Sequence, residues 1–240
     1  MLHGATVAVV VPAHDEARLI ARTLASIPAW VDRVVVVDDA SSDDTKGRAE
    51  GCGDPRVTVV RHAVNRGVGA AIVTGYREAF EAGADVAAVM AGDAQMDPAD
   101  LRAVVEPVAR GEADYVKGNR LAHPDARRAM PLFRLVGNHA LSALTRLATG
   151  LDVHDSQCGY TAMHRRVAER VRLQRLWPRY GYPNDLLSRL AVARLRVRDV
   201  PVRPVYADEE SGIRTHDLLV SFPLVIGLGF ARRLAAPTRP

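Results

Sequence analysis

Val86-Ala-Ala-Val-Met-Ala-Gly-Asp-Ala-Gln-Met-Asp-Pro98 carries the clearest pattern in this 240-residue chain. Its apolar beginning, residues 86–90, is typical of a strand buried on both faces, and Gly92 breaks the run. Asp93 and Gln95 follow at once. Because ligands bind beyond the carboxyl ends of strands in open α/β sheets, we expect both side chains at a binding site. Their oxygens suit a divalent cation and, through it, a diphosphate.

The acidic residues of this stretch also have simpler interpretations. Asp97 precedes Pro98, and this pair predicts a helix that Asp97 caps, with Pro98 as its first residue. Asp93 is either a turn residue or a cation ligand, and the rest of the chain has to decide between the two.

The residues before this stretch predict alternating strands and helices. β-branched runs predict strands at 6–11, 32–39 and 56–61, and apolar residues at helical spacing predict helices at 18–27 and from the loop 65–69 to about residue 82. The intervals are too short for anything but crossover helices. They therefore predict a parallel sheet with right-handed connections.

The second half of the chain has a looser pattern. It predicts a helix at 99–110, a strand at 114–117, a basic loop at 120–134, a helix at 132–149, a loop and strand at 152–163, a helix at 184–194 and a strand at 196–202. We find no internal repeat and no interdomain linker.

The C-terminal tail, residues 216–240, permits two interpretations. Its apolar part, 218–230, is interrupted by one proline and two glycines and falls short of the ~20 residues that span a bilayer. It either packs on the core or lies in a membrane interface, with Arg232 and Arg233 toward anionic headgroups.

Composition narrows the class of protein. With 48% hydrophobic residues the chain can bury a core, which excludes a disordered protein. A net charge of +4 suits an anionic small molecule or a membrane surface and requires no nucleic acid. Cys52 and Cys158 lack metal-ligand spacing, so we expect a reducing compartment. Without a signal-peptide pattern, we expect the protein in the cytoplasm, with the inner face of the membrane as the alternative.

Acidic and polar groups also follow the earlier predicted strands, at Glu16 and at Asp38-Asp39. The loop Asn65-Arg-Gly-Val-Gly69 would let backbone approach a ligand closely. The chain has neither the dinucleotide fingerprint after its first strand nor a Walker sequence. These patterns argue against a nicotinamide dehydrogenase and a P-loop enzyme.

Six motifs in order resemble the family 2 glycosyltransferases of GT-A fold, most closely the branch of dolichyl- and polyprenyl-phosphate sugar synthases. The motifs are Val9-Val-Val-Pro-Ala-His-Asp-Glu16, Val35-Val-Val-Asp-Asp-Ala-Ser-Ser-Asp-Asp-Thr45, Asn65-Arg-Gly-Val-Gly-Ala70, Gly92-Asp-Ala-Gln-Met-Asp-Pro98, Gly118-Asn-Arg120 and Asp155-Ser-Gln-Cys-Gly-Tyr160. The resemblance covers nearly the whole chain. It implies an α/β fold with a mostly parallel, Rossmann-like central sheet, flanking helices and a short helical tail. Residues 1–215 would form the GT-A domain, with a nucleotide-sugar half, 1–98, and an acceptor half, 99–215.

The resemblance also implies a donor site for a nucleotide-diphosphate sugar. The residues implied in donor binding are Pro12, Ala13, Glu16, Asp39, Asn65, Gly69 and Asp93. Asp93 and Gln95 would hold Mg²⁺ or Mn²⁺ on the diphosphate. The family's metal motif usually reads Asp-x-Asp, and Ala91 stands where its first Asp would be.

On the acceptor side, Arg120 and Arg134 match phosphate-binding positions of the polyprenyl-phosphate branch, and the planar guanidinium pairs well with phosphate oxygens. Arg214 would supply charge to the late loop, where the family often has Lys beside Ser. Two residues compete as general base, Asp155 and Asp185. Asp155 is favoured for positioning at the acceptor side, and Asp185 has a helix cap as its structural alternative.

The reaction that the resemblance implies is an inverting glycosyl transfer to a polyprenyl phosphate at the cytoplasmic membrane face. A soluble sugar or other small-molecule acceptor is the first alternative. A nucleotidyltransferase or a non-catalytic nucleotide-sugar-binding protein is the second. The oligomeric state stays open.

Overall fold

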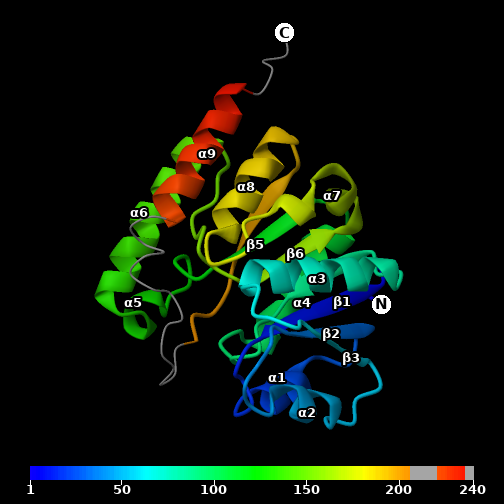
Figure 1. Ribbon diagram of the computed structural model, residues 1–240. Coiled ribbons are helices and arrows are strands. Elements are labelled where there is room, and N and C mark those ends of the chain that lie inside the picture. Colours follow the sequence, from blue (N-terminus) through cyan, green and yellow to red (C-terminus); the bar gives the residue numbers. More distant parts are fainter. Residues whose placement is uncertain (206–220, 236–240) are drawn as a thin grey trace.

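The computed structural model describes residues 1–205 and 221–235, which contain a seven-stranded sheet in the order β3-β2-β1-β4-β6-β5-β7 (Figure 1). The strands are β1 (Val7–Ala13), β2 (Arg33–Asp38), β3 (Val57–Arg61), β4 (Val86–Val89), β5 (Tyr115–Asn119), β6 (Thr161–His164) and β7 (Val197–Pro201). β6 runs antiparallel to β4 and β5, and every other pair is parallel. The carboxyl ends of β1, β4 and β5 therefore lie at one edge.

Helices cover both faces of this sheet (Figure 1). They are α1 (Ile20–Ser26), α2 (Thr45–Glu50), α3 (Val68–Glu81), α4 (Leu101–Ala109), α5 (Ala126–Ala129), α6 (Leu132–Thr149), α7 (Arg165–Arg170), α8 (Tyr182–Val192) and α9 (Phe222–Ala235). Side chains alternate along β1, so Val9 belongs to the core cluster that includes residues of α1 and α4, while Val10 belongs to the cluster that includes residues of α3 and α8. The fold class expected from the sequence is confirmed, and β6 is the reason that the sheet is only mostly parallel.

Two local differences from the sequence prediction lie in the second half. The stretch 120–134, expected to be a loop, contains α5, whereas α6 has the bounds predicted for the helix at 132–149. α7 was not predicted, because it has only six residues and a single buried position, Val167. The predicted cap is present, since the Asp97 carboxylate accepts a hydrogen bond from the Ala99 N–H at 2.9 Å.

The described part of the tail contains α9, which packs against α6 and α8 (Figure 1). Phe222, Val225 and Gly229 are its buried positions, and a Cβ at Gly229 would lie 3.0 Å from Ser188 of α8. The Arg232 guanidinium donates to the Asp185 carboxylate and, at 2.7 Å, to the Ser188 hydroxyl. Within the described residues, no helix combines the length and apolar character needed to cross a bilayer.

Candidate active site

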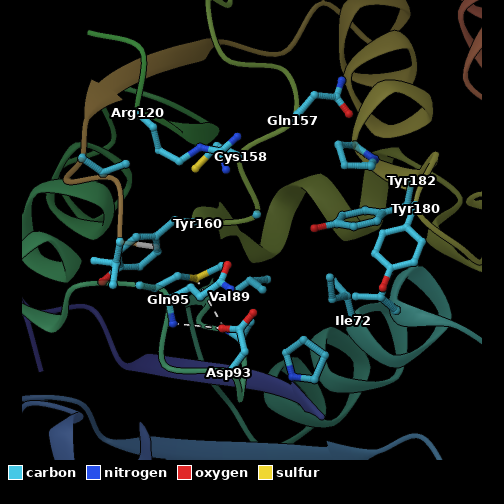
Figure 2. A pocket seen from close by; sticks show the side chains of 18 of the residues that line it. Ile72, Val89, Asp93, Gln95, Arg120, Gln157, Cys158, Tyr160, Tyr180 and Tyr182 are labelled. Atoms are coloured by element: carbon cyan, nitrogen blue, oxygen red, sulfur yellow. Dashed lines mark hydrogen bonds between the residues drawn. The ribbon is translucent and has the colours of Figure 1, made fainter. Parts of the chain in front are cut away.

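A cavity of about 240 Å³ opens at the sheet edge where β1, β4 and β5 end (Figure 2). Pro12 comes from β1, Val89 from β4, and Arg120 directly follows β5. The remaining described lining residues are Val68, Ile72, Ala91, Asp93, Gln95, Met96, Gln157, Cys158, Gly159, Tyr160, Tyr180, Tyr182, Pro183, Val202, Arg203, Val205 and Phe222. Asp93 is the one acidic residue among those described.

A tight turn presents Asp93 and Gln95 to this cavity (Figure 2). The Gln95 N–H donates to Asp93 Oδ1 at 3.0 Å, and Ala94 between them has a left-handed φ of 57°. Such a conformation costs a non-glycine residue about 1–3 kcal/mol, and strain of this kind concentrates at functional sites. The loops after β1 and β2 each contain one such residue too, Asp15 and Ala40. All three loops lie at the edge where a ligand is expected.

Arg120 is held on the opposite side of the cavity by Asp155. Its Nε and Nη2 donate to the two carboxylate oxygens at 2.8 and 3.0 Å, and its backbone N–H adds a third hydrogen bond at 3.1 Å. Burial alone would raise the pKa of Asp155, but the charge and hydrogen bonds of Arg120 outweigh it and keep that pKa below its usual value. Asp155 is fully buried and does not line the cavity. It positions Arg120.

Lys117 lies behind this pair. Its side chain is completely buried, and its Nζ donates to the Cys158 carbonyl. Burial lowers the pKa of Lys117 to about 8, against the opposing effect of Cys158 and Asp155. Burial also raises the pKa of the Cys158 thiol. Lys117 thus ties the end of β5 to the loop that carries Cys158.

The loops after β1 and β2, which carry most of the first two motifs, are hydrogen-bonded to each other, and of these two motifs only Pro12 lines the cavity. The Asp15 carboxylate accepts from the Ser42 N–H at 2.7 Å, and the pKa of Asp15 is lowered, chiefly by this hydrogen bond. In return, the Thr45 hydroxyl accepts from the Glu16 N–H at 2.8 Å. The loops after β1 and β2 are therefore braced against one another.

Asp39 and the glycine loop form a second brace. Buried Asp39 accepts hydrogen bonds from the N–H groups of Arg66 and Gly67 at 2.9 and 2.7 Å and from His62 Nδ1 at 2.6 Å. Gly69 lies against the segment 177–182, since a Cβ there would be 2.4 Å from the Trp177 carbonyl oxygen. The close approach of Gly69 is therefore made to protein backbone, and Val68 is the residue of this loop that lines the cavity.

Asp185 and Arg134 also lie outside the cavity lining. The Asp185 carboxylate is buried, and it accepts from the Trp177 N–H at 2.9 Å, from Arg189 Nε at 3.1 Å and from Arg232. It does not cap α8, whose N-cap is Gly181. Arg134 lies in the first turn of α6, with its guanidinium carbon 5.9 Å from the centre of the Phe133 ring.

The structure thus brings together part of the expected site. Pro12, Asp93, Gln95 and Arg120 share the cavity. The expected residues that do not line it are Ala13, Glu16, Asp39, Asn65, Gly69, Arg134, Asp155 and Asp185. Ala13 is in the core, and Asn65 is exposed. Arg214 falls outside the described residues.

Three tyrosines of the cavity were not predicted as site residues. Tyr180 and Tyr182 lie on one wall and Tyr160 on another (Figure 2). The Tyr160 hydroxyl donates to the Asp97 carbonyl at 3.0 Å, and burial raises its pKa. Aromatic residues make up only 5% of the chain, so the pair Tyr-Gly-Tyr at 180–182 was a signal that could have been used.

The residues present fit a cation shared with a ligand. Among the described residues, no three His, Cys, Asp or Glu side chains gather into a metal-binding group. Mg²⁺, however, is often held by one or two carboxylates together with substrate phosphates and water. The Asp93 carboxylate, with the Gln95 amide beside it, lines the cavity and supplies this type of oxygen.

Comparisons with known proteins identify relatives of this chain. A sequence profile described as glycosyl transferase family 2 matches residues 8–172. The UDP-N-acetylglucosamine–dolichyl-phosphate N-acetylglucosaminyltransferase of Methanococcus voltae is 29% identical over 90% of this chain and 91% of its own length. The undecaprenyl-phosphate mannosyltransferase of Micrococcus luteus is 29% identical over 85% of this chain and 84% of its own.

A solved structure shares the fold. Glucosyl-3-phosphoglycerate synthase from Mycobacterium tuberculosis, in complex with Mn²⁺, UDP and glucosyl-3-phosphoglycerate, superposes with a TM-score of 0.67 at 25% identity. The match covers 98% of this chain and 82% of that one.

Proposed function

The chain belongs to glycosyl transferase family 2, and from that premise we propose that it transfers a sugar from a nucleotide diphosphate to a polyprenyl phosphate. One observation carries the proposal. A single cavity has the oxygen-bearing side chains of Asp93 and Gln95 on one side and Arg120 on another. Two anionic groups, a diphosphate and a phosphate, can be bound there next to each other.

The positions of the carboxylates favour a phosphate as the acceptor. A sugar hydroxyl needs a base to take its proton as the new bond forms, whereas a phosphate is already ionised. The Asp155 carboxylate accepts hydrogen bonds from the Arg120 guanidinium, and the Asp185 carboxylate accepts them from Arg189 and Arg232. Neither lines the cavity. The two similar enzymes named above act, by their names, on dolichyl phosphate and undecaprenyl phosphate.

We propose an inverting displacement, in which the phosphate oxygen attacks the anomeric carbon from the face opposite the nucleotide. Asp93 and Gln95 would hold Mg²⁺ or Mn²⁺, which supplies charge stabilisation to the departing diphosphate. Arg120, fixed by Asp155, would orient the acceptor phosphate with its planar fork. Mn²⁺ and UDP are bound together in the similar synthase structure.

The organisation of the chain is part of the same proposal. Residues 1–98 would bind the donor and residues 99–215 the acceptor. The tail, 216–240, would contact the membrane peripherally from the cytoplasmic side, because Leu224, Leu228 and Phe230 of α9 are exposed.

The test is transfer of a radiolabelled sugar from UDP- and GDP-sugars to a polyprenyl phosphate by the purified chain. We expect a chloroform-soluble product that depends on Mn²⁺ or Mg²⁺, and a loss of at least about a hundredfold in Asp93→Asn. Arg120→Gln should raise the KM for the polyprenyl phosphate more than the KM for the donor. The anomeric configuration of the product, read by NMR, tests inversion.

Transfer only to a free sugar or another hydroxyl acceptor would replace the phosphate acceptor by the soluble-acceptor alternative. Nucleotide binding without turnover on any acceptor would contradict the proposal altogether.

A further inference from the structure

Helix α6 is amphipathic, but its apolar side faces outward. Leu132, Phe133, Val136, Leu144 and Leu147 are between 50% and 75% exposed. Together with exposed alanines at 140 and 143, they recur at helical spacing along about 22 Å of the helix. A helix of a globular protein ordinarily buries such a stripe.

The side that α6 does bury consists mainly of hydroxyl-bearing residues. Its buried positions are Ser142, Thr145, Thr149 and Ala148. The Ser142 hydroxyl accepts from the Ser156 N–H at 2.9 Å, and the Thr145 hydroxyl donates to the Asn184 side-chain oxygen at 3.0 Å. These hydrogen bonds fix the rotation of the helix, so its leucines cannot turn inward without leaving buried polar groups unsatisfied.

Helix α9 extends this apolar surface. It lies beside α6 (Figure 1), and Leu224, Leu228, Phe230 and Leu234 are exposed on it. Of the thirteen exposed large hydrophobic side chains in the described residues, nine lie on these two helices. This concentration marks an interaction surface rather than scattered exposure.

The charge of the helices around this apolar surface indicates which kind of partner binds there. Residues 126–149 and 221–235 contain six arginines and no Asp or Glu. Arg232 is paired with Asp185 on α8, and the other five are Arg127, Arg128, Arg134, Arg146 and Arg233. A second copy docking by a two-fold axis would bring this basic surface against itself, which like charges oppose. Anionic lipid headgroups complement it.

We infer that the exposed faces of α6 and α9 form a bilayer-docking surface, with the apolar stripe in the interface and the arginines at anionic headgroups. This inference rests on the proposed function, because it supplies the surface from which a lipid-borne acceptor is taken. Phe222, the buried first residue of α9, lines the cavity, so this helix joins the proposed docking surface to the site. The inference thus adds α6 to the membrane contact that was proposed above for the tail alone.

The experiment is sedimentation of the full chain with vesicles of phosphatidylcholine and phosphatidylglycerol. We expect the triple variant Leu132→Gln, Phe133→Gln, Val136→Gln to reduce the vesicle partition coefficient about tenfold or more. Val136→Gln and Val64→Gln form a matched pair, since these valines are 59% and 66% exposed and only the first lies on α6. Only Val136→Gln should weaken binding. Circular dichroism and urea unfolding confirm that each variant is folded.

These vesicles contain no polyprenyl phosphate and no donor, so a failure of sugar transfer leaves this result untouched. Three outcomes overturn the inference. They are no sedimentation with anionic vesicles, equal losses in Val136→Gln and Val64→Gln, and a dimer in analytical ultracentrifugation that the triple variant dissociates.

Discussion

Ala91 is the single residue at which this chain departs from the family's metal motif. It lines the cavity together with Asp93, and its N–H donates to the Met96 sulfur at 3.3 Å. Ala91→Asp would add a second carboxylate to a site that has one. We expect it to tighten Mn²⁺ binding about tenfold in the presence of UDP, because hard cations gain from each added carboxylate oxygen.

Isothermal titration of Mn²⁺ into the UDP-bound protein measures this effect. Ala91→Asn, which adds an amide without the charge, is the control and should gain much less. An Asp variant that binds Mn²⁺ no better than the wild type would place the cation away from residue 91.

Lys117 makes the stability of the fold depend on pH in the alkaline range. Its pKa is about 8 in the folded protein, against 10.5 for an ordinary, solvated lysine. Between pH 8 and pH 10.5, Lys117 is therefore protonated in the unfolded chain but neutral in the folded one. The contribution of Lys117 to the free energy of unfolding must therefore rise as the pH increases from 8 to 10.5. The same contribution is lost as the pH falls back to 8. Relative to Lys117→Met, the wild type should gain about 2–3 kcal/mol across this window.

Urea unfolding of both proteins at pH 7.5 and pH 10.5 gives this difference, in which the titration of all other groups cancels. If the free energy of unfolding changed equally between the two pH values in both proteins, Lys117 would be solvated in the folded state.

The contact between helix α3 and the segment 177–182 is made possible by a glycine. A Cβ at Gly69 would lie 2.4 Å from the Trp177 carbonyl oxygen and 2.8 Å from Tyr182 Cβ. Gly69→Ala should therefore lower the free energy of unfolding by about 1–3 kcal/mol through overpacking. Gly137→Ala in α6 is the matched control, because nothing lies within 4 Å of its Cβ position, and helix propensity predicts a gain of up to about 1 kcal/mol.

Urea unfolding measures both substitutions. Equal effects at positions 69 and 137 would contradict the tight contact.

Elements with one strong local pattern could be predicted from the sequence. The valine-rich runs of β1 and β2 and the apolar run of β4 gave strands near their observed bounds, because β-branched residues between turn signals leave little alternative. α7 was missed, since its six residues show no helical period. The rotation of α6 was not predictable either. Its apolar residues fit a helix in any orientation, and only the hydroxyl partners Ser156 and Asn184 decide which side is buried.

The candidate site was predictable where it follows a strand directly. Asp93 and Arg120 come after β4 and β5 and reach the cavity. Asp39 also follows a strand, but the N–H groups of the glycine loop occupy its oxygens. A sequence shows that a carboxylate ends a strand, and it does not show which backbone donors will come to it from a distant loop.

At the scale of the whole molecule, side-chain contacts of Arg232 hold α9 against α8, and we call this set of contacts the clamp. Arg232 binds Asp185 and Ser188, whereas its neighbour Arg233 donates only to the Leu147 carbonyl among the contacts observed. Arg232→Gln should speed amide hydrogen exchange in α9 and lower the free energy of unfolding by about 1–3 kcal/mol, because buried Asp185 loses a charged partner.

Hydrogen exchange read by mass spectrometry tests the clamp, with Arg233→Gln as the control of smaller effect. Exchange in α9 that responds equally to both substitutions would show that apolar packing alone holds the helix.

The reversed strand β6 stands between β4 and β5. Because β6 lies between them, β4 and β5 are two inter-strand spacings apart, which is about 10 Å. The residues that directly follow these two strands are separated by the same interval. That interval is built into the backbone, so no side-chain replacement can lengthen or shorten it. Donor preference and acceptor preference should consequently behave as separable traits, and loops grafted from a relative onto one side ought to change one specificity while the other persists.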